Sequence, residues 1–283
     1  MDTERITRIF KQIDKFRNID KGEIQISSGL SSLCRVRANG KEYCLKSVIS
    51  KEMGDSELDG LNALREMTPN VPEAFGTAHD KNEYFIILEY IENTTLNKPG
   101  PIFETMRSVY SCKGGYWGWR KDNFVGTLPQ KNSPHKDFIS YFMRDRIEPL
   151  LRLTHENDLL ERSLKDDILS LIYKKSADWS LGKITPRLIH GDLWSGNLLQ
   201  AKNGKVYLID PSVSFGHPEQ DFAMSLLFGG VHSGWIEPIA EELQLENGFS
   251  ERVPFWQIYP LLVHVRLFGG GYIESLKRAV HYY

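Results

Sequence analysis

The spacing of apolar residues changes along this chain, and each change predicts a different kind of element. Near the N-terminus they lie three or four positions apart among charged residues, which predicts an amphipathic surface helix; they are Ile6, Ile9, Phe10, Ile13 and Phe16. Between residues 24 and 48 apolar and polar residues alternate, which predicts strands. Helical spacing returns at residues 54–67 and dominates from about residue 135 onward. The pattern predicts an α+β protein with its strands mainly in the N-terminal part.

The N-terminal strands carry a strong turn signal. A first strand begins at residue 24, and the dipeptide Asn39-Gly40 joins two further strands into a hairpin. A two-residue turn at this dipeptide pairs Arg35 with Cys44. Cys34 and Cys44 then lie on opposite faces of the hairpin, so we expect no disulfide between them.

A loop of small residues separates the first two strands, and it is a candidate site for phosphate contacts. Its backbone N–H groups and hydroxyls could reach phosphate oxygens; the candidates are Ser28, Gly29, Ser31 and Ser32. Lys46 ends the third strand and would project toward the same phosphates. The alternatives are an ordinary tight turn and a solvated lysine.

The helix expected at residues 54–67 supplies a candidate partner for this lysine. Its leucines are spaced to pack on the sheet, and Glu57 near its start could form an ion pair with Lys46. The alternative is a surface glutamate that the helix dipole favours at that end.

One stretch in the second half carries oxygen-bearing side chains at a spacing that predicts phosphoryl transfer. Asp192 and Asn197 stand five positions apart, in the D-x-x-x-x-N pattern of a kinase catalytic loop. In that pattern the aspartate accepts the proton of the substrate hydroxyl and the asparagine binds a magnesium ion. Asp210 follows thirteen positions later, after an apolar strand, where a second magnesium ligand is expected. Together these residues predict a kinase that uses ATP and Mg²⁺.

An apolar strand running into acids and turn formers predicts a hinge at about residues 89–93. The hinge backbone, at Glu89 and Ile91, would bind the edge of an adenine ring. This hinge would divide the chain into an N-terminal nucleotide-binding lobe, residues 1–90, and a C-terminal catalytic and substrate-binding lobe, residues 91–283.

Residues 94–136 are rich in glycine, proline, asparagine and aromatic residues, which predicts a long irregular segment. Exposed aromatic rings and amides, including Gln130 and Asn132, would suit a sugar, because rings cover its apolar face and amides bond its hydroxyls. The alternative is a packed surface loop.

The rest of the second half reads as helices. Two are expected at about residues 135–153 and 158–175, and Pro149 should kink or break the first. Another begins after His217 with acids in its first turn and ends at paired glycines. His217 and His264 are candidates for substrate contact, and the alternative for each is a structural histidine.

Composition narrows the class of partner. The 283 residues carry 35 basic and 37 acidic side chains, and a net charge of −2 predicts no nucleic-acid partner and no polybasic membrane anchor. No apolar run is long enough to span a membrane, and the N-terminus does not resemble a signal peptide. Three cysteines without a C-x-x-C pattern predict neither a disulfide framework nor a zinc site. We expect a cytoplasmic protein with a small-molecule partner.

Four segments together resemble the fructosamine kinase family (ketosamine 3-kinases). They are residues 122–132, 190–197, 208–230 and 259–272, and the resemblance runs from the first hairpin to the C-terminus. The tryptophan that follows Asp192-Leu193 and the Leu-Phe-Gly-Gly-Gly-Tyr segment ending at Tyr272 separate this family from its relatives, the aminoglycoside phosphotransferases and choline kinases.

The resemblance implies a two-lobed protein-kinase-like fold with a small antiparallel-sheet N-lobe and a mainly helical C-lobe. It also implies ATP-dependent phosphorylation of a ketoamine, a sugar joined through an amine, at the hydroxyl of its third carbon. Such phosphates eliminate, so the expected role is deglycation of amino acids or proteins. The family's roles then fall on Asp192 as base, Asn197 and Asp210 as magnesium ligands, Lys46 and Glu57 as ion pair, Trp194 on the substrate side, and Asp221 as a brace for the catalytic loop.

Two departures from the family and several alternatives remain. Leu30 stands where some relatives carry a redox-active cysteine, so we expect no such switch, and residues 105–110 differ from the family pattern. The nearest alternative is another small-molecule kinase of the same fold, acting on an amino alcohol, a thioribose or an aminoglycoside. A non-catalytic nucleotide-binding protein is the other. The sequence leaves open the sugar, the carrier amine and the oligomeric state.

Overall fold

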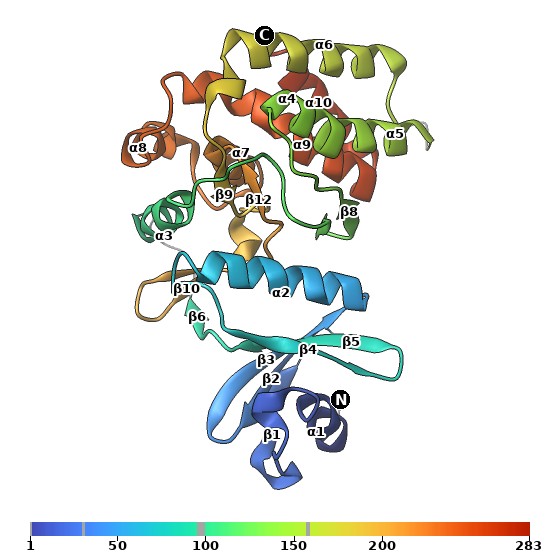
Figure 1. Ribbon diagram of the computed structural model, residues 1–283, viewed down its shortest axis with the longest axis vertical. Helices are drawn as coiled ribbons and strands as arrows, with labels where there is room; N and C mark the ends of the chain where they lie inside the picture. The colour runs from blue at the N-terminus through green and yellow to red at the C-terminus, as the bar shows by residue number, and fades with distance from the viewer. Residues whose placement is uncertain (1, 30–31, 95–99, 157–158) are drawn as a thin grey trace. The chain divides into compact units, whose positions relative to one another are not determined.

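The chain folds into two compact units (Figure 1). The first comprises residues 1–96 and 199–211, and the second comprises residues 97–198 and 212–283. None of the helices in the described part of the chain is long and apolar enough to cross a membrane. The computed structural model describes residues 2–29, 32–94, 100–156 and 159–283.

An antiparallel sheet of five strands forms the body of the first unit. The strand order is β1–β2–β3–β5–β4, and the strands span Ile24–Gly29, Leu33–Ala38, Lys41–Val48, Ala74–Asp80 (β4) and Glu83–Glu89 (β5). The register predicted for the β2–β3 hairpin is confirmed, because Arg35 pairs with Cys44. Cys34, Cys44 and Cys112 are all free thiols.

Two helices cover opposite faces of this sheet. Ile87 belongs to the apolar cluster formed with α1 (Thr3–Phe10), whereas Ile86 lies against Gly54 of α2 (Lys51–Arg65). Since successive strand residues point to opposite faces, the two helices must lie on different sides of the sheet. The predicted N-terminal helix is confirmed in part: its apolar residues belong to the cluster on the sheet, but the helix ends at Phe10, and Ile13 and Phe16 lie beyond it.

The second helix begins earlier than its leucine spacing predicted. Ser50 accepts a hydrogen bond from the Met53 N–H at 3.3 Å, so the helix starts at Lys51 and not at Gly54. Gly54 lies inside the helix, where a Cβ atom would stand 3.1 Å from Thr77 Cγ2. The glycine therefore permits close packing of the helix on the sheet.

A short hairpin from late in the sequence belongs to the first unit, which differs from the expected division of the chain at residues 89–93. β10 (Leu198–Ala201) pairs with β6 (Asn93–Thr94) and with β11 (Val206–Leu208). The Leu208 N–H also donates to the Asn70 carbonyl at 3.0 Å. These backbone hydrogen bonds place residues 199–211, and with them Asp210, in the first unit.

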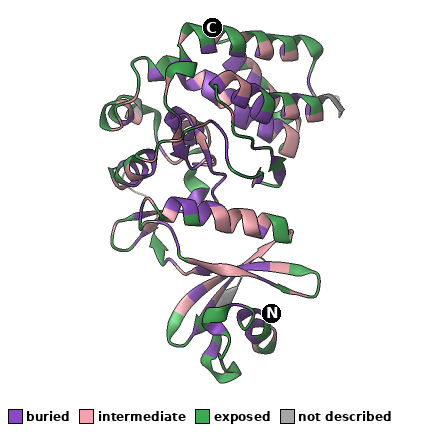
Figure 2. Ribbon diagram, viewed as in Figure 1, coloured by how far each residue is buried: buried purple, intermediate pink, exposed green. Residues whose placement is uncertain are grey.

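The second unit is mainly helical. Its elements are α3 (Gly100–Tyr110), β7 (Asn123–Val125), β8 (Leu128–Gln130), α4 (Phe138–Tyr141), α5 (Glu148–Glu156), α6 (Arg162–Asp178), β9 (Arg187–Ile189), β12 (Ser214–Gly216), α7 (Pro218–Phe228), α8 (Ile236–Glu242), α9 (Phe249–Phe268) and α10 (Ile273–Val280). α9 contacts α5, α7, α8 and α10, and Figure 2 shows buried residues along it. The core of this unit therefore surrounds α9.

One expectation for this unit was wrong, and for another the structure contradicts only the alternative of a broken helix. The segment expected to be irregular contains α3, whose first turn holds Gly100 and Pro101, and proline is tolerated at that point of a helix. Pro149 does not break the helix around it; a π-helical stretch, Phe142–Ile147, leads directly into α5. In a regular helix the N–H of residue 149 would donate to the Asp145 carbonyl, but proline has no N–H. This carbonyl accepts a hydrogen bond from Arg146 Nη1 instead, at 3.1 Å.

A buried ion pair ties α7 to α9. Arg252 Nε and Nη2 donate to the two carboxylate oxygens of Glu219 at 2.8 and 2.6 Å, and Trp256 Nε1 donates to the same carboxylate at 2.7 Å. The Glu219 side chain is fully buried. Because a buried carboxylate without its cation is costly, this pair is essential to the packing of the unit.

We expect Arg252→Met to lower the free energy of unfolding of the second unit by about 3–5 kcal/mol, since Glu219 would keep a buried charge without a cation. All six tryptophans lie in this unit, so tryptophan fluorescence during urea denaturation measures it selectively. Arg278→Met is the control, because Arg278 is exposed and bonds only to Ser275 in the described hydrogen-bond set. Equal stability of the two variants would contradict the assignment.

Candidate active site

Lys46, Glu57 and Asp210 form one cluster within the first unit. β3 carries Lys46, α2 carries Glu57, and the β10–β11 hairpin leads to Asp210. Lys46 Nζ donates to both carboxylate oxygens of Glu57, at 2.9 and 2.8 Å, and to Oδ1 of Asp210. The structure thus brings together three residues that lie far apart in the sequence.

This cluster holds two carboxylates around one ammonium group. Burial raises the pKa of the Glu57 carboxyl, although Lys46 opposes that shift. Burial disfavours the Lys46 ammonium, but the two carboxylates outweigh it and raise the pKa of Lys46. With both carboxyls ionised, the two acids outnumber the one ammonium group, and a bound cation would balance this negative charge.

Asp210 is the member of the cluster that is open to a ligand. Its side chain is 39% exposed, compared with 19% for Lys46 and 12% for Glu57. Its φ angle of +53° lies in the left-handed region, which residues other than glycine rarely adopt. Strained backbone of this kind concentrates at functional sites.

Asp192 and Asn197 form a second cluster, within the second unit. Asn197 Nδ2 donates to both the main-chain oxygen and Oδ2 of Asp192, each at 2.8 Å. These two bonds use both hydrogens of the amide nitrogen and leave Oδ1 as the coordinating atom of the Asn197 side chain. A side chain that presents an oxygen suits a hard cation such as Mg²⁺.

Asp221 at the start of α7 braces the loop that carries Asp192. Its Oδ2 accepts the His190 N–H and its Oδ1 accepts the Gly191 N–H, both at 2.8 Å, and the Tyr110 hydroxyl donates to Oδ2 at 3.1 Å. Burial raises the pKa of Asp221 to about 6, against the effect of these donors. His190 is also buried, and its Nδ1 accepts the Asp192 N–H at 3.2 Å.

Two glycines of this loop allow contacts that no other residue could make. Gly191 has φ +81°, and a Cβ atom there would lie 2.0 Å from the Ser212 carbonyl oxygen. At Gly196 a Cβ would lie 2.4 Å from the Trp194 indole. The indole therefore packs over Gly196 and stays 37% exposed beside the Asp192–Asn197 pair.

Gln130 and Asn132 occupy a different position from the one expected. Both are buried, and both Gln130 Nε2 and Asn132 Nδ2 donate to Asn123 Oδ1 at 2.8 Å. Tyr259 donates to Gln130 Oε1, and Arg146 Nη2 donates to Asn132 Oδ1 at 2.8 Å. Each amide is thus committed to a buried network and is not exposed to a sugar.

This network supports the chain that follows Asp210. Asn123 Nδ2 donates to the Val213 carbonyl at 2.8 Å, and Gln130 Nε2 donates to Ser212 Oγ at 3.3 Å. The Ser212 N–H donates to the His190 carbonyl at 2.8 Å. The amides therefore support the catalytic loop indirectly.

His217 is a helix cap in this structure. Its Nδ1 accepts the Glu219 N–H at 3.2 Å at the start of α7, and its ring stacks on Trp256 with 4.9 Å between centroids. Burial lowers the pKa of His217 to about 4, so the ring is neutral near pH 7. His217 is therefore better described as a structural histidine than as a residue that contacts substrate in the catalytic site.

His264 lies in a partly exposed aromatic cluster. Its ring stacks on Phe228 with 3.8 Å between centroids, and Tyr272 and the exposed Phe268 lie at 4.9 and 5.3 Å. Ser195 Oγ donates to the Phe228 carbonyl at 3.4 Å, which links this cluster to the loop of Trp194. Burial lowers the pKa of His264. His264 therefore stays a candidate for substrate contact.

The predicted phosphate loop and hinge are described only in part. Ser28 and Gly29 end β1 and pair with Arg35 and Cys34, while Ser31 lies outside the described residues. The Ser32 carbonyl accepts the Ser47 N–H at 2.8 Å, which places the end of the loop beside Lys46.

At the hinge, the Glu89 N–H donates to the Glu73 carbonyl at 2.8 Å, and the Ile91 side chain is buried. The Glu89 N–H is therefore already used within the first unit. An adenine contact by the backbone at Ile91 stays a prediction.

Tyr110, Tyr259 and Arg146 are the supporting residues that the sequence did not reveal. Each acts through hydrogen bonds to residues more than ten positions away. Tyr259 lies within one of the four family-like segments, which was the available signal, but nothing in its spacing indicated a partner.

Comparison with known proteins places this geometry in a family. The profile of the family described as fructosamine kinase matches residues 3–283. An Enterococcus faecium protein named "Probable ketoamine kinase" is 32% identical over 254 residues, which cover 87% of this chain and 89% of that protein.

Solved structures show the same fold. A Thermobifida fusca protein, provisionally named a fructosamine-3-kinase, matches with a TM-score of 0.81 at 24% identity and covers 98% of this chain and 96% of its own. The choline kinase of Streptococcus pneumoniae matches with a TM-score of 0.60 at 18% identity, covering 98% and 97%. The expected two-lobed, kinase-like α+β fold is confirmed.

The family profile spans nearly the whole chain, and the bacterial relative exceeds 30% identity over most of both sequences. With the Asp192–Asn197 pair and the Lys46–Glu57–Asp210 cluster in place, the chain belongs to the fructosamine kinase family.

Proposed function

We propose that this protein phosphorylates ketoamines, with ATP as donor and Mg²⁺ as metal, at the hydroxyl of the third sugar carbon. The observation that carries the proposal is the Asp192–Asn197 pair on a loop braced by Asp221, in a chain of the fructosamine kinase family. The resulting phosphate would eliminate, so the biological result would be deglycation of the carrier amine.

The first unit would bind the nucleotide. Lys46, held by Glu57, would contact the phosphates, and the loop that ends at Ser32 lies beside it. Glu89 and Ile91 mark the segment whose backbone would meet the adenine. A fixed cation next to a triphosphate stabilises the charge that develops during transfer, which is the main requirement of phosphoryl transfer.

Asn197 and Asp210 would hold the metal. Asn197 presents Oδ1, because both hydrogens of its amide bond to Asp192, and Asp210 is the exposed carboxylate of a cluster with excess negative charge. Oxygen ligands of this kind suit Mg²⁺, which would neutralise charge on the phosphates when bound.

Asp192 would orient the acceptor hydroxyl and accept its proton. Asn197 holds the Asp192 carboxylate by Oδ2, and the buried brace at Asp221 holds the loop backbone. Trp194, which is exposed, and His264, which is half-buried and linked to the same loop through Phe228 and Ser195, would contact the sugar or its carrier amine. Positioning supplies most of the rate gain in such a reaction.

A substrate screen tests the proposal directly. Phosphorylation would be measured over ketoamines of differing sugar length, free and protein-bound, with the product position assigned by NMR. Choline, an aminoglycoside and methylthioribose represent the alternative kinase of the same fold, to which the choline kinase similarity points. Turnover of these compounds and not of ketoamines would overturn the proposed substrate. Absence of Mg²⁺-dependent nucleotide turnover with every compound would instead indicate a non-catalytic protein.

We expect Asp192→Asn to lower kcat about 10²- to 10⁴-fold, because the variant loses a general base but can still accept the bond from Asn197. Binding of AMP-PNP, measured by calorimetry, should change little. Asp166→Asn, an exposed position on α6, is the matched control. Near-normal turnover in the Asp192 variant would refute the assigned base.

We expect Lys46→Met to lower kcat/KM for ATP by about 10²-fold or more, since the variant leaves Glu57 and Asp210 as uncompensated carboxylates facing a triphosphate. The matched control is Lys51→Met, which removes an exposed lysine from the same unit. A value of kcat/KM within twofold of the wild type would show that Lys46 does not contact the nucleotide.

We expect the stability lost in Asp221→Asn to depend on pH. Burial raises the pKa of Asp221 from 3.8 to about 6, so the folded state binds this proton more tightly than the unfolded state. The stabilising contribution is complete below about pH 4 and is lost as pH rises to about 6, a change of about 3 kcal/mol. The variant should therefore be more destabilised at pH 4 than at pH 7 in urea denaturation. A penalty that grows with pH would show that the three donors depress the pKa instead.

A further inference from the structure

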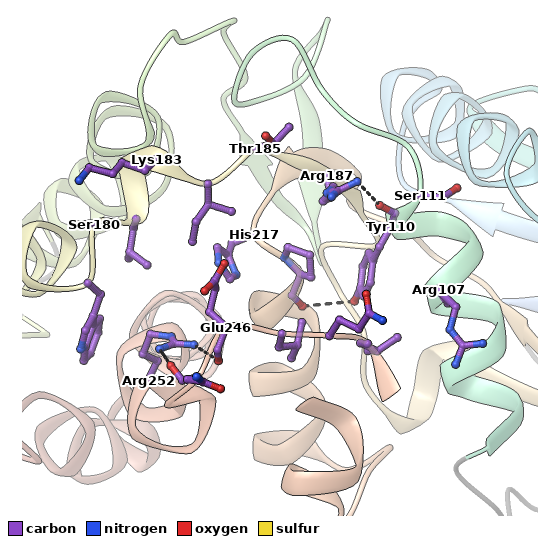
Figure 3. Close-up of a pocket in the computed structure, with 18 residues that line it drawn as sticks. Arg107, Tyr110, Ser111, Ser180, Lys183, Thr185, Arg187, His217, Glu246 and Arg252 are labelled. Carbon is purple, nitrogen blue, oxygen red and sulfur yellow. Dashed lines mark hydrogen bonds between the residues drawn. The ribbon is translucent and has the colours of Figure 1, made fainter. Parts of the chain in front are cut away.

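A cavity of about 800 Å³ lies entirely within the second unit, and the proposed reaction does not use it (Figure 3). It is bounded by the end of α3, residues 179–187, the start of α7 and residues 243–247. Its lining includes none of Asp192, Trp194 or Asn197. The cavity is large enough for a small organic molecule.

The charged residues that line this cavity are mainly cationic. Four side chains carry positive charge, Arg107, Lys183, Arg187 and Arg252, and Glu246 is the one carboxylate among the lining residues. Arg252 is bound to Glu219, and Arg107 pairs with Glu242. Lys183 and Arg187 then stand against Glu246 alone, so the lining keeps a net positive charge after these two ion pairs are counted.

Lys183 and Arg187 have no carboxylate within ion-pair distance in the described part of the chain. Arg187 Nη1 donates to the Tyr110 carbonyl at 3.3 Å, which leaves most of its five N–H donors available. Figure 3 shows Arg187 beside Tyr110 in the cavity wall. A planar guanidinium with free donors binds oxyanions through two parallel hydrogen bonds.

A buried donor also lines the cavity. His217 Nδ1 accepts the Glu219 N–H, so its proton lies on Nε2, and Nε2 has no hydrogen-bond partner among the described residues. Buried donors without a partner are rare in native proteins and call for an explanation. An acceptor on a bound molecule that reached this ring would supply the missing partner.

Part of the remaining wall is apolar. It comprises Trp179, Leu181, Ile184, Pro218, Leu243 and Leu245. An inorganic anion would leave this surface in contact with water, whereas a molecule with an apolar part would cover it. The two kinds of lining together favour a ligand that is anionic at one end and apolar at the other.

One lining residue connects the cavity to the catalytic loop. The Tyr110 hydroxyl donates to Oδ2 of Asp221, the oxygen that also accepts the His190 N–H. The Tyr110 carbonyl is the group bonded to Arg187. Tyr110 is thus the single residue between Arg187, which would bind a ligand, and Asp221, which braces the catalytic loop.

We propose that this cavity is a second binding site, for a small organic molecule that carries a phosphate or carboxylate group and an apolar part. Arg187 binds the anionic group, and the apolar residues of the wall cover the apolar part. Occupancy is transmitted through Tyr110 to Asp221 and the loop that Asp221 holds.

Calorimetry with phenyl phosphate tests this site, with AMP-PNP and Mg²⁺ at saturation to fill the proposed nucleotide site. We expect one site that binds phenyl phosphate at least tenfold more tightly than inorganic phosphate or benzyl alcohol. A parallel titration with benzoate shows whether the site also accepts a carboxylate group. Arg187→Gln and Arg187→Lys should each weaken binding at least fivefold, because neither keeps the planar set of guanidinium donors. Arg162→Gln, at an exposed arginine of α6 outside the cavity, should not.

Several results would overturn the proposal. They are absence of binding, affinities unchanged in both cavity variants, and equal affinity for inorganic phosphate, which would remove the role of the apolar wall. Should Arg187→Gln fail to fold, Arg187→Lys still decides the matter, because it keeps the positive charge and loses the planar set of donors. The measurement needs no turnover, so it is independent of the proposed ketoamine kinase activity.

Amide hydrogen exchange tests the connection to the loop. The N–H groups of His190 and Gly191 both donate to Asp221, so phenyl phosphate should slow their exchange in the wild type and not in Arg187→Gln. Unchanged exchange in a wild-type protein that binds the ligand would overturn the transmission through Tyr110.

Discussion

The structure of the candidate catalytic loop depends on one buried carboxylate. Asp221 accepts the N–H groups of His190 and Gly191 and the hydroxyl of Tyr110, so a side chain of α7 holds the backbone that precedes Asp192. Hydrogen bonds to an ionised group are stronger than neutral ones, and they offset part of the cost of burying its charge. Gly191 completes the arrangement, because its positive φ lets the loop pass within contact of the Ser212 carbonyl. The loop that is held in this way carries the hydrogen bond between Asn197 and Asp192.

The two units differ in how far their functional carboxylates are exposed to solvent. In the first, Lys46 is shared between Glu57 and Asp210, and the excess carboxylate lies on the exposed Asp210, whose backbone is strained. In the second, two deeply buried carboxylates serve the fold: Glu219 ties α7 to α9, and Asp221 braces the catalytic loop. Accessible negative charge is therefore found where a metal–nucleotide complex would need it, and buried negative charge where the fold needs it.

Residues that suggested sugar binding serve two different purposes. Gln130 and Asn132 form a buried network with Asn123, Arg146 and Tyr259, which fixes the β7–β8 hairpin against the chain that follows Asp210. The aromatic surface instead comes from other segments, since His264 reaches the loop of Trp194 through Phe228 and Ser195. Amide groups so buried must bond within the protein, whereas a partly exposed ring can bind a ligand.

The sequence by itself determined the fold class, the β2–β3 register and the grouping of Asp192 with Asn197, because each depends on contacts over a few residues: alternation, an Asn-Gly turn, and a five-residue spacing. The family-like segments indicated Asp221 as the brace, but its third donor, Tyr110, is more than a hundred positions away and left no local signal. Only the tertiary structure decided that residues 199–211 join the first unit, that Gln130 and Asn132 are buried, and that α3 forms where glycine and proline suggested a loop. Burial and long-range hydrogen bonding depend on which distant segments pack together, and the local pattern of a chain does not record that.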